Sequence, residues 1–311
     1  MNTLRYIRVL SDGRPGHENQ SVGLALALAR RTGATHEIVH LDPAASLWGR
    51  LRVAGRATES AKKTDLVIAA GHRTHLPLWW AGRQLGARTV VIMSPSLPGC
   101  LFDLSLVPRH DAPGGEDTTR RILTKGALNR VPEAIPEKTA AGLVLVGGPS
   151  KHHGWDGARL ASMITRVTAA QPELEWTVAD SRRTPAGFLS DLRLAANVTK
   201  VPHQQTGPGW LADELAKAST VWVTADSVSM VHEAATAGAE TGVFPVPFGK
   251  AGGGRPQRAV DALISERLVT DFPAWEKAGG GGLQRRPGAL LHEAGRCADW
   301  IVARWFSNSS A

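Results

Sequence analysis

The chain contains only two cysteines, Cys100 and Cys297, in 311 residues. Two thiols cannot build a zinc site or a disulfide framework, so a reducing cytoplasm is the expected compartment. No apolar run approaches the roughly 20 residues that span a bilayer. The first residues also lack the apolar core and cleavage site of a signal peptide. We therefore expect a cytoplasmic protein, and adherence to the inner face of the cytoplasmic membrane stays open.

Long blocks of basic residues are missing as well, although the net charge is +8. The arginines and lysines are scattered, and the tryptophans are not interleaved with them as in a surface that stacks nucleic-acid bases. This pattern argues against a nucleic-acid partner. A basic protein of this kind favours a phosphorylated small molecule or an anionic membrane surface.

Metal-binding signatures are incomplete. His232-Glu233 and His292-Glu293 begin like the zinc motif HExxH, but each lacks the second histidine. The adjacent His152 and His153 have no carboxylate or thiolate at ligand spacing. The sequence therefore predicts no metal site.

Strand-like and helix-like runs alternate along nearly the whole chain, which predicts parallel sheets with crossover helices. The predicted strands are 6–10, 37–41, 65–70, 89–93, 104–107, 122–123, 142–146, 175–179, 198–201, 221–224 and 241–246. The predicted helices are 21–31, 76–85, 155–169, 185–196, 210–217, 227–237, 257–268 and 289–306. The last of these has an apolar stripe made of Leu290, Ala294, Cys297, Ile301 and Trp305.

A Pro- and charge-rich segment at 129–141 divides the chain into two halves. We expect two Rossmann-like, doubly wound α/β domains, residues 1–138 and 139–285. In such sheets ligands bind at the carboxyl ends of the strands. The loops that follow strands are therefore the candidate sites.

The first such loop reads SDGRPGHENQ and covers residues 11–20, between a predicted strand and a predicted helix. Gly13 and Gly16 permit tight turns and a close approach of ligand to backbone. His17 and Glu18 are available as proton acceptors. The alternative is structural, with Asn19 or Ser21 capping the helix and His17 on the surface.

Three further loops carry polar side chains. In 70–75, Arg73 and two histidines could face an anionic or sugar ligand, or be merely exposed. Gly148, Ser150 and Lys151 in the loop 147–155 make a plausible phosphate cradle. In 179–185, Ser181 and Arg182 could face a nucleotide, although solvated arginines would fit equally well.

The segment 224–235 is the most informative. Asp226 or Ser227 would begin a helix, and Ser227 and Ser229 in its first turn suit a diphosphate. Glu233 follows Ser229 by four residues, on the same helical face, where it could accept the hydroxyls of a ribose. Serine caps and an exposed glutamate remain the alternative.

These segments carry a family resemblance. TADSVSMVHEAATAG, at 224–238, resembles the donor-binding element of GT-B glycosyltransferases. With SDGRPGHENQSVGLALAL, GHRTHLP, FDLSLVPRHD and DSRRTP, it resembles the family named after the plant mitochondrial fission factor Elm. Bacterial members of that family are regarded as glycosyltransferases of lipooligosaccharide outer-core assembly.

The resemblance implies a GT-B fold, in which two Rossmann-like domains face a cleft. The acceptor would bind the first domain and the nucleotide-sugar the second, and a final helix within 286–311 would pack back on the first domain. No metal or other cofactor is implied, and a UDP-sugar is the expected donor. The implied donor-binding residues are Gly148, Ser150, Lys151, Ser181, Arg182, Asp226, Ser227, Ser229, Met230 and Glu233. The implied acceptor-side residues are Gly13, Gly16, Asn19, Gln20 and Arg73.

The favoured function is a metal-independent glycosyltransferase acting on a lipid-linked or lipopolysaccharide-type acceptor. A base must deprotonate the acceptor hydroxyl, and His17, Asp12 and Glu18 compete for that role. One alternative is a nucleotide-sugar epimerase of the same fold. Another is a non-enzymatic, membrane-associated scaffold, as the plant fission role suggests.

Overall fold

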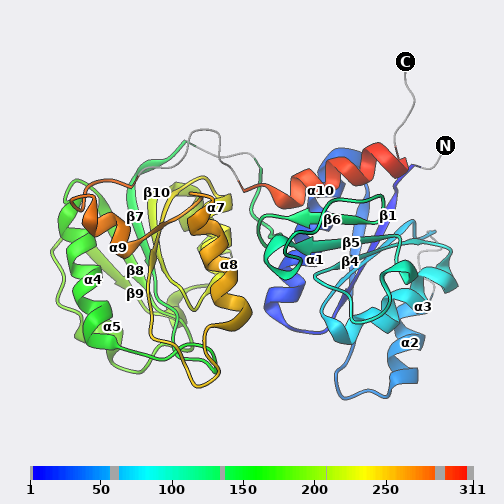
Figure 1. The fold of residues 1–311 in the computed structure, drawn as a ribbon, viewed down its shortest axis with the longest axis horizontal. Coiled ribbons are helices and arrows are strands. Elements are labelled where there is room, and N and C mark those ends of the chain that lie inside the picture. The colour runs from blue at the N-terminus through cyan, green and yellow to red at the C-terminus, as the bar shows by residue number, and fades with distance from the viewer. Residues whose placement is uncertain (1–2, 57–62, 134–136, 208, 284–290, 307–311) are drawn as a thin grey trace. The chain divides into compact units, whose positions relative to one another are not determined.

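A computed structural model describes residues 3–56, 63–133, 137–207, 209–283 and 291–306. The chain packs into two compact α/β units (Figure 1). The first comprises Met1–Arg130 and His292–Ala311, and the second comprises Val131–Leu291. The boundaries expected from sequence lay after residues 138 and 285.

The first unit is built on a sheet of parallel strands. Among the described residues it has six strands in the order β2-β1-β3-β4-β5-β6. Near-continuous apolar sequences suit strands covered on both faces, and β1, β3 and β5 are buried throughout. The strands are β1 (Tyr6–Ser11), β2 (Thr35–His40), β3 (Leu66–Ala70), β4 (Arg88–Ile92), β5 (Leu104–Pro108) and β6 (Arg121–Thr124).

Helices α1 (Pro15–Thr32), α2 (Leu47–Gly55), α3 (His75–Leu85) and α10 (Glu293–Ile301) cover this sheet (Figure 1). Pro15 occupies the first turn of α1, where its fixed φ favours helix initiation. Gly33, at φ +72°, ends the helix with an N–H donated to the carbonyl of Ala29. Gly23 lets α1 press on the chain at Asn129, because a Cβ there would lie 2.1 Å from the Asn129 carbonyl oxygen.

The second unit repeats the arrangement with a different strand order. Its six described strands are parallel, in the order β12-β11-β10-β7-β8-β9. The strands are β7 (Thr139–Leu145), β8 (Glu175–Ala179), β9 (Val198–Val201), β10 (Ala218–Thr224), β11 (Glu240–Phe244) and β12 (Thr270–Asp271). The helices are α4 (Gly157–Ala170), α5 (Phe188–Asp191), α6 (Trp210–Lys217), α7 (Val228–Thr236), α8 (Gly254–Ser265) and α9 (Phe272–Lys277).

Both sheets reverse their strand order once. In the first unit this happens between β1 and β3, and in the second between β7 and β10. At such a switch point two successive loops leave the sheet in opposite directions and open a crevice at the carboxyl ends of the strands. The predicted fold class, two doubly wound α/β domains, is confirmed.

Several element boundaries predicted from sequence are wrong. The helix expected at 21–31 begins at Pro15, so the connection after β1 is only Asp12–Arg14 and not ten residues long. The helix expected at 185–196 shrinks to α5. Gly187, at φ +86°, interrupts its start, and Lys200 donates to the carbonyls of Ser190 and Leu192 at its end. The elements α2, α9 and β12 were not predicted.

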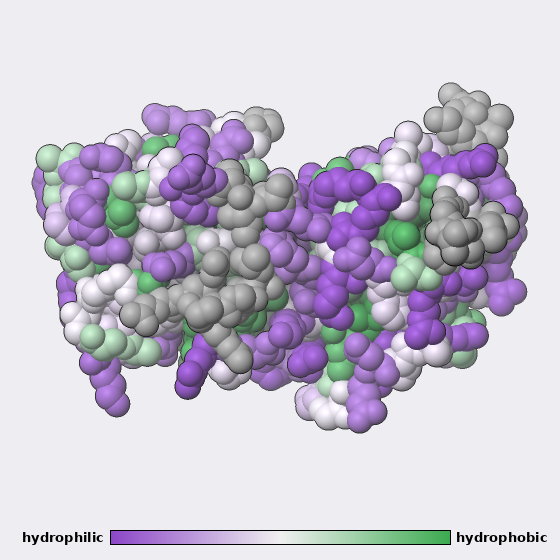
Figure 2. All heavy atoms as spheres, turned by 90° about the horizontal axis from the view of Figure 1, so that it is seen from above, coloured by the Kyte–Doolittle hydropathy of each residue, from purple (hydrophilic) through white to green (hydrophobic). Residues whose placement is uncertain are grey.

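The last helix of the described chain, α10, packs against α1, and Cys297 and Ile301 lie in the core of the first unit. It continues into a π-helical turn at Val302–Phe306. Leu290, expected on the same stripe, lies outside the described residues. On the face that carries α10, hydrophilic residues cover most of the surface and apolar ones form small patches (Figure 2).

Candidate functional site

At the switch point of the first unit, Asp12 and His17 form a pair. Asp12 directly follows β1 and its side chain is 3% exposed, whereas that of His17, in the first turn of α1, is 19% exposed. Nδ1 of His17 lies 3.1 and 3.0 Å from the two carboxylate oxygens of Asp12. Because a carboxylate only accepts, the Nδ1 nitrogen carries the proton and Nε2 is left as an acceptor.

The ring of His17 also packs on the loop that follows β3. A Cβ at Gly71 would lie 2.3 Å from Nδ1 of His17, so glycine is required at 71 for this contact. Asp12 and Gly71 thus fix the imidazole from the two loops of the switch point. An imidazole held in this way can act as a positioned general base.

Glu18 is engaged in different contacts. Its carboxylate accepts a hydrogen bond of 2.7 Å from the hydroxyl of Ser11 and one of 2.9 Å from the guanidinium of Arg130. The hydrogen bond from Ser11 is the main reason why the pKa of Glu18 is lowered, and Arg130 adds to it against the raising effect of burial. A carboxylate stabilised in its charged form is a weak proton acceptor.

The remaining acceptor-side residues differ in exposure. Gly13, at φ +74°, makes the turn after β1, and Gly16 lies in α1. Asn19 Oδ1 accepts the N–H of Arg130, and Gln20 donates to the carbonyl of Gly16. Arg73 lies exposed after β3.

His75, one of the two histidines of the loop 70–75, is buried. It is 2% exposed at the start of α3, and its Nδ1 accepts the backbone N–H of Ser96 at 3.0 Å. Burial, helped by the positive potential of His72 and His17, lowers the pKa of His75 to about 4. The residue is therefore a neutral part of the core.

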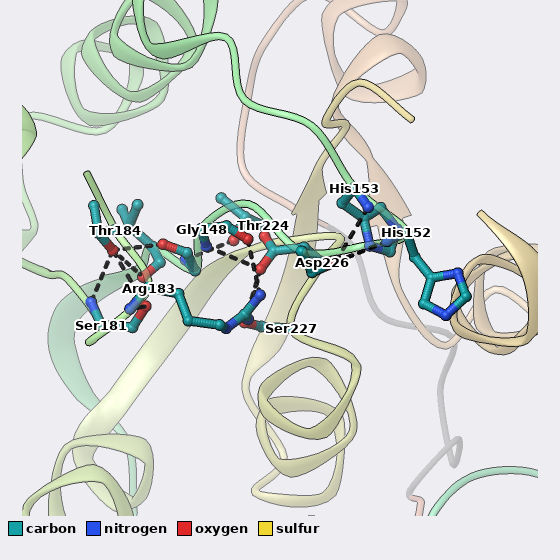
Figure 3. A network of polar contacts seen from close by, with 12 residues as sticks. Gly148, His152, His153, Ser181, Arg183, Thr184, Thr224, Asp226 and Ser227 are labelled. Carbon is teal, nitrogen blue, oxygen red and sulfur yellow. Dashed lines mark hydrogen bonds and ion pairs between the residues drawn. The ribbon is translucent and has the colours of Figure 1, made fainter. Parts of the chain in front are cut away.

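At the switch point of the second unit, four hydrogen bonds join Asp226 and Arg183 to each other and to Gly148 and Ser227 (Figure 3). The carboxylate of Asp226, whose side chain is 1% exposed, accepts the backbone N–H of Gly148 at 2.9 Å and a guanidinium N–H of Arg183 at 2.7 Å. Arg183 also donates to the hydroxyl of Ser227 at 3.0 Å and to the carbonyl of Gly148 at 2.8 Å. The loops after β7, β8 and β10 are tied together by these bonds.

Two consecutive glycines make this convergence possible. A Cβ at Gly147 would lie 2.1 Å from Oδ2 of Asp226, and one at Gly148 would lie 2.1 Å from the carbonyl oxygen of Arg183. The hydroxyl of Thr184 adds a bond from the β8 loop to the carbonyl of Gly147. The glycines after β7 therefore serve close packing of loop on loop.

The start of α7 lies in the same network. Ser227 is the N-cap residue, but its side chain makes no capping hydrogen bond within the described chain, contrary to the structural alternative above. The N–H groups of the first helical turn, which includes Ser229 and Met230, are the groups that a helix leaves without intrahelical partners. Ser229 is exposed, and Glu233 is half-buried further along α7.

Other residues expected at the donor site have local roles. The hydroxyl of Ser150 accepts the N–H groups of His152 and His153 at 3.2 and 3.1 Å and so closes a turn. The hydroxyl of Ser181 lies 3.2 Å from that of Thr184 in another turn. Lys151 is exposed.

Arg182 was expected to face the nucleotide, but its neighbour Arg183 is the arginine that enters the network of loop contacts. Arg182 is exposed, and no side-chain hydrogen bond of Arg182 occurs with the described part of the chain. Arg183 enters the network, because the turn formed by Ser181 and Thr184 directs it toward β7 and β10. Sequence alone did not separate the two adjacent arginines.

The sequence analysis considered His153 only as a metal ligand, and it missed a pair formed by Asp180 and His203. His153 is 1% exposed; burial lowers its pKa, and the nearby carboxylate of Asp226 opposes that shift. Asp180 and His203 form a second pair, with Nδ1 of His203 3.0 Å from the carboxylate. Asp180 directly follows β8 and His203 lies two residues after β9, and these positions were the available signal for the pair.

No cluster of three or more metal-ligating side chains occurs among residues 3–56, 63–133, 137–207, 209–283 and 291–306. Over these same residues no helix has the length and apolar character needed to cross a bilayer.

A family model described as Mitochondrial fission ELM1 matches residues 15–305. The chain belongs to this family. A protein of Rickettsia prowazekii (strain Madrid E), carrying the name Uncharacterized protein RP120, is 25% identical over 230 residues, and the match covers 59% of this chain and 65% of the relative. The match therefore spans slightly less than two thirds of that curated relative.

Solved structures share the fold. The calicheamicin glycosyltransferase CalG4 is similar with a TM-score of 0.54 and 15% identity, over 98% of this chain and 100% of that one. The UDP-GlcNAc 2-epimerase from Neisseria meningitidis, bound to UDP-GlcNAc, is similar with a TM-score of 0.51 and 12% identity, over 96% and 100%. The chain thus has the GT-B fold, and both a glycosyltransferase and an epimerase are built on it.

Proposed function

We propose that the protein is a glycosyltransferase that moves a sugar from a nucleotide-diphosphate sugar to an acceptor hydroxyl. The observation that carries this proposal is Arg183, whose guanidinium meets the Gly148 loop and the start of α7 at the switch point of the second unit. A fixed cation beside the N-terminus of a helix is a combination suited to a diphosphate.

We infer that Arg183 and the N–H groups at the start of α7 stabilise the departing diphosphate. Negative charge develops on this leaving group in the transition state, and preorganised donors lower the energy of that charge. Ser227 and Ser229 would add hydroxyl donors, and Glu233 would accept from the ribose. Since Arg183 supplies the positive charge, the proposed reaction needs no metal.

We infer further that His17 is the general base and Asp12 its positioning residue. Asp12 holds the proton on Nδ1, so Nε2 can accept the proton of the acceptor hydroxyl. Glu18 is a poorer candidate because Ser11 and Arg130 favour its charged form. The proposed acceptor is lipid-linked or of the lipopolysaccharide type.

Isothermal titration calorimetry with UDP and a set of UDP-sugars tests the donor assignment. We expect binding to the wild-type chain and to the exposed-site variant Arg182→Gln, and strongly weakened binding to Glu233→Ala. Equal affinity of Glu233→Ala and wild type would contradict the assignment of Glu233 to the ribose. Absence of binding by the wild type to every UDP compound would overturn the proposed function.

A nucleotide-sugar epimerase is the second candidate, because a UDP-GlcNAc 2-epimerase has the same fold over nearly the whole chain. An epimerase acts on the free nucleotide-sugar and needs no acceptor. NMR of UDP-GlcNAc incubated with the protein separates the two functions. Formation of a new epimer would replace the glycosyltransferase proposal with the epimerase.

A further inference from the structure

The outer face of α2 is unusually apolar for an exposed surface. In the part of the chain that the structure describes, the large hydrophobic side chains that stand exposed are Leu47, Trp48, Val53 and Phe248. Three of these lie on α2, at 44%, 75% and 46% exposure respectively. An apolar cluster of this kind marks an interaction surface, whereas single exposed hydrophobic residues are ordinary.

Hydrogen bonds hold α2 to the sheet of the first unit, although its outer face is exposed. Arg8, a buried residue of β1, donates to the carbonyls of Ala54 and Arg56 at 2.9 and 2.6 Å and to Glu37 at 2.7 Å. These bonds satisfy carbonyls at the C-terminal end of α2. The exposure of Trp48 is therefore not the result of a loosely attached helix.

A pocket of about 510 Å³ lies between α2 and α3, which pack side by side (Figure 1). Gly55 allows the two helices to approach, since a Cβ there would lie 3.1 Å from the indole nitrogen of Trp80. The pocket is lined by Trp48, Leu51, Arg52, Gly55, Arg56, Trp80 and Gln84. Indole rings beside guanidinium groups fit a ligand that is apolar at one end and anionic at the other.

The charged residues of α2 and α3 have one sign. The sequence from 47 to 56 and from 75 to 85 includes no aspartate or glutamate. The same two stretches contain Arg50, Arg52, Arg56 and Arg83. A helix with arginines around exposed tryptophan and leucine is the pattern of a segment that lies in the interface of an anionic bilayer.

We propose that the α2 face, defined as Leu47, Trp48, Arg52, Val53 and Arg56 with the adjoining pocket, docks the protein on an anionic phospholipid membrane. Trp48, Leu47 and Val53 enter the headgroup region, and Arg52 and Arg56 bind lipid phosphates. None of these residues belongs to the candidate sites after β1, β7 or β10. A variant can therefore lose membrane docking and keep the proposed glycosyl transfer, or the reverse, so the two proposals are tested separately.

Flotation of the full-length chain with vesicles tests the proposal. We expect the wild type to float with vesicles of phosphatidylcholine containing about one third phosphatidylglycerol. It should not float with vesicles of pure phosphatidylcholine, and its binding to the anionic vesicles should weaken as salt screens the charges. Since each arginine contributes roughly fivefold to partition onto an anionic surface, Arg52→Glu/Arg56→Glu should lose more than about twentyfold. Trp48→Ser should lose roughly tenfold.

Matched variants on the second unit serve as controls. Arg159→Glu/Arg193→Glu makes the same change of net charge at exposed positions, and Phe248→Ser removes the exposed apolar residue outside α2. Both should float like wild type. Circular dichroism and UDP titration of every variant show whether the fold and the donor site are intact.

Three results would overturn the proposal. The first is that the wild type does not float with anionic vesicles. The second is that the charge-matched control loses vesicle binding as much as the α2 charge variant. The third is that both α2 variants bind the vesicles as well as the wild type. A fourth would assign the face to a second copy of the chain: a concentration-dependent dimer in gel filtration that Trp48→Ser abolishes, without any vesicle binding.

Discussion

Replacement of Arg183 by glutamine should weaken both the second unit and its binding of nucleotide diphosphate. The substitution leaves the carboxylate of Asp226, 1% exposed, without its cationic partner. Removing one member of a fully buried ion pair costs about 3–5 kcal/mol, but the Arg183 side chain is 42% exposed, so water screens part of the interaction. We expect a loss of about 1–2 kcal/mol in the free energy of unfolding.

The effect on binding should be larger than the effect on stability. A charge-assisted hydrogen bond to a phosphate contributes about 2 kcal/mol, which corresponds to a roughly 30-fold higher Kd for UDP. Calorimetric titration measures the Kd, and urea unfolding followed by circular dichroism measures the stability. Arg182→Gln is the matched control: it removes the same charge one residue earlier, and its unfolding free energy should change by less than about 0.5 kcal/mol.

The pairing of Arg183 with Asp226 can be tested by a double-mutant cycle. Asp226→Asn removes the buried charge that Arg183→Gln leaves unpaired, so the double variant should be more stable than the sum of the single effects predicts. Additive losses would show that the two residues do not interact. Normal UDP affinity of Arg183→Gln, together with weak affinity of Arg182→Gln, would refute the assignment of Arg183 to the diphosphate.

Three other changes have distinct expected outcomes. Asp12→Asn and His17→Ala should each lower the kcat of UDP release from the accepted UDP-sugar roughly 10²- to 10⁴-fold, with the Kd of the donor unchanged. Glu18→Gln should leave kcat nearly unchanged. A large loss of kcat in Glu18→Gln alone would assign the base to Glu18. Gly147→Ala, whose Cβ would meet Asp226, should lower the free energy of unfolding by about 1–3 kcal/mol. Gly99→Ala, whose Cβ would have no neighbour within 4 Å, should lower it little. Equal melting temperatures of the two variants would contradict the close packing at Gly147. His75 binds protons more weakly in the folded than in the unfolded chain. Its contribution of roughly 3 kcal/mol to the free energy of unfolding is therefore present above pH 6.5 and is lost as the pH falls toward 4. In urea unfolding, His75→Asn should flatten this pH dependence of stability, whereas the exposed control His40→Asn should leave it unchanged.

Much of the fold could be predicted because parallel strands and amphipathic helices leave strong sequence patterns. The bounds predicted for β8, β9 and α6 coincide with those observed. The patterns fail where an element is short or is stabilised by residues of a distant segment. Strand β12 has two residues, and the end of helix α2 is stabilised by Arg8 of β1. The early start of α1 was missed because its first turn is polar, and the prediction followed the apolar residues after it.

The candidate site was predictable as loops but not as contacts. Position after a strand was enough to mark Asp12, His17 and Asp226, because the carboxyl ends of neighbouring parallel strands meet at one edge of the sheet. The choice of Arg183 over Arg182 depends on a turn closed by Thr184 and on the space left by Gly148. Such information lies in the packing of three loops and in no single segment.

The two switch points share a physical arrangement that explains why a buried aspartate occurs at each. Asp12 lies directly after β1 and Asp226 shortly after β10, and burial of an unpaired carboxylate at either place would be strongly unfavourable. Each is compensated by a side chain that can carry positive charge, His17 in one unit and Arg183 in the other. The difference lies in the partner: an imidazole held by Nδ1 still offers Nε2 as a proton acceptor, whereas a guanidinium stays charged and can only donate. In the proposed glycosyl transfer, the carboxylate of Asp12 would orient the base on the first unit and that of Asp226 the anion-binding group on the second, which are the two roles that transfer from a nucleotide-diphosphate sugar requires.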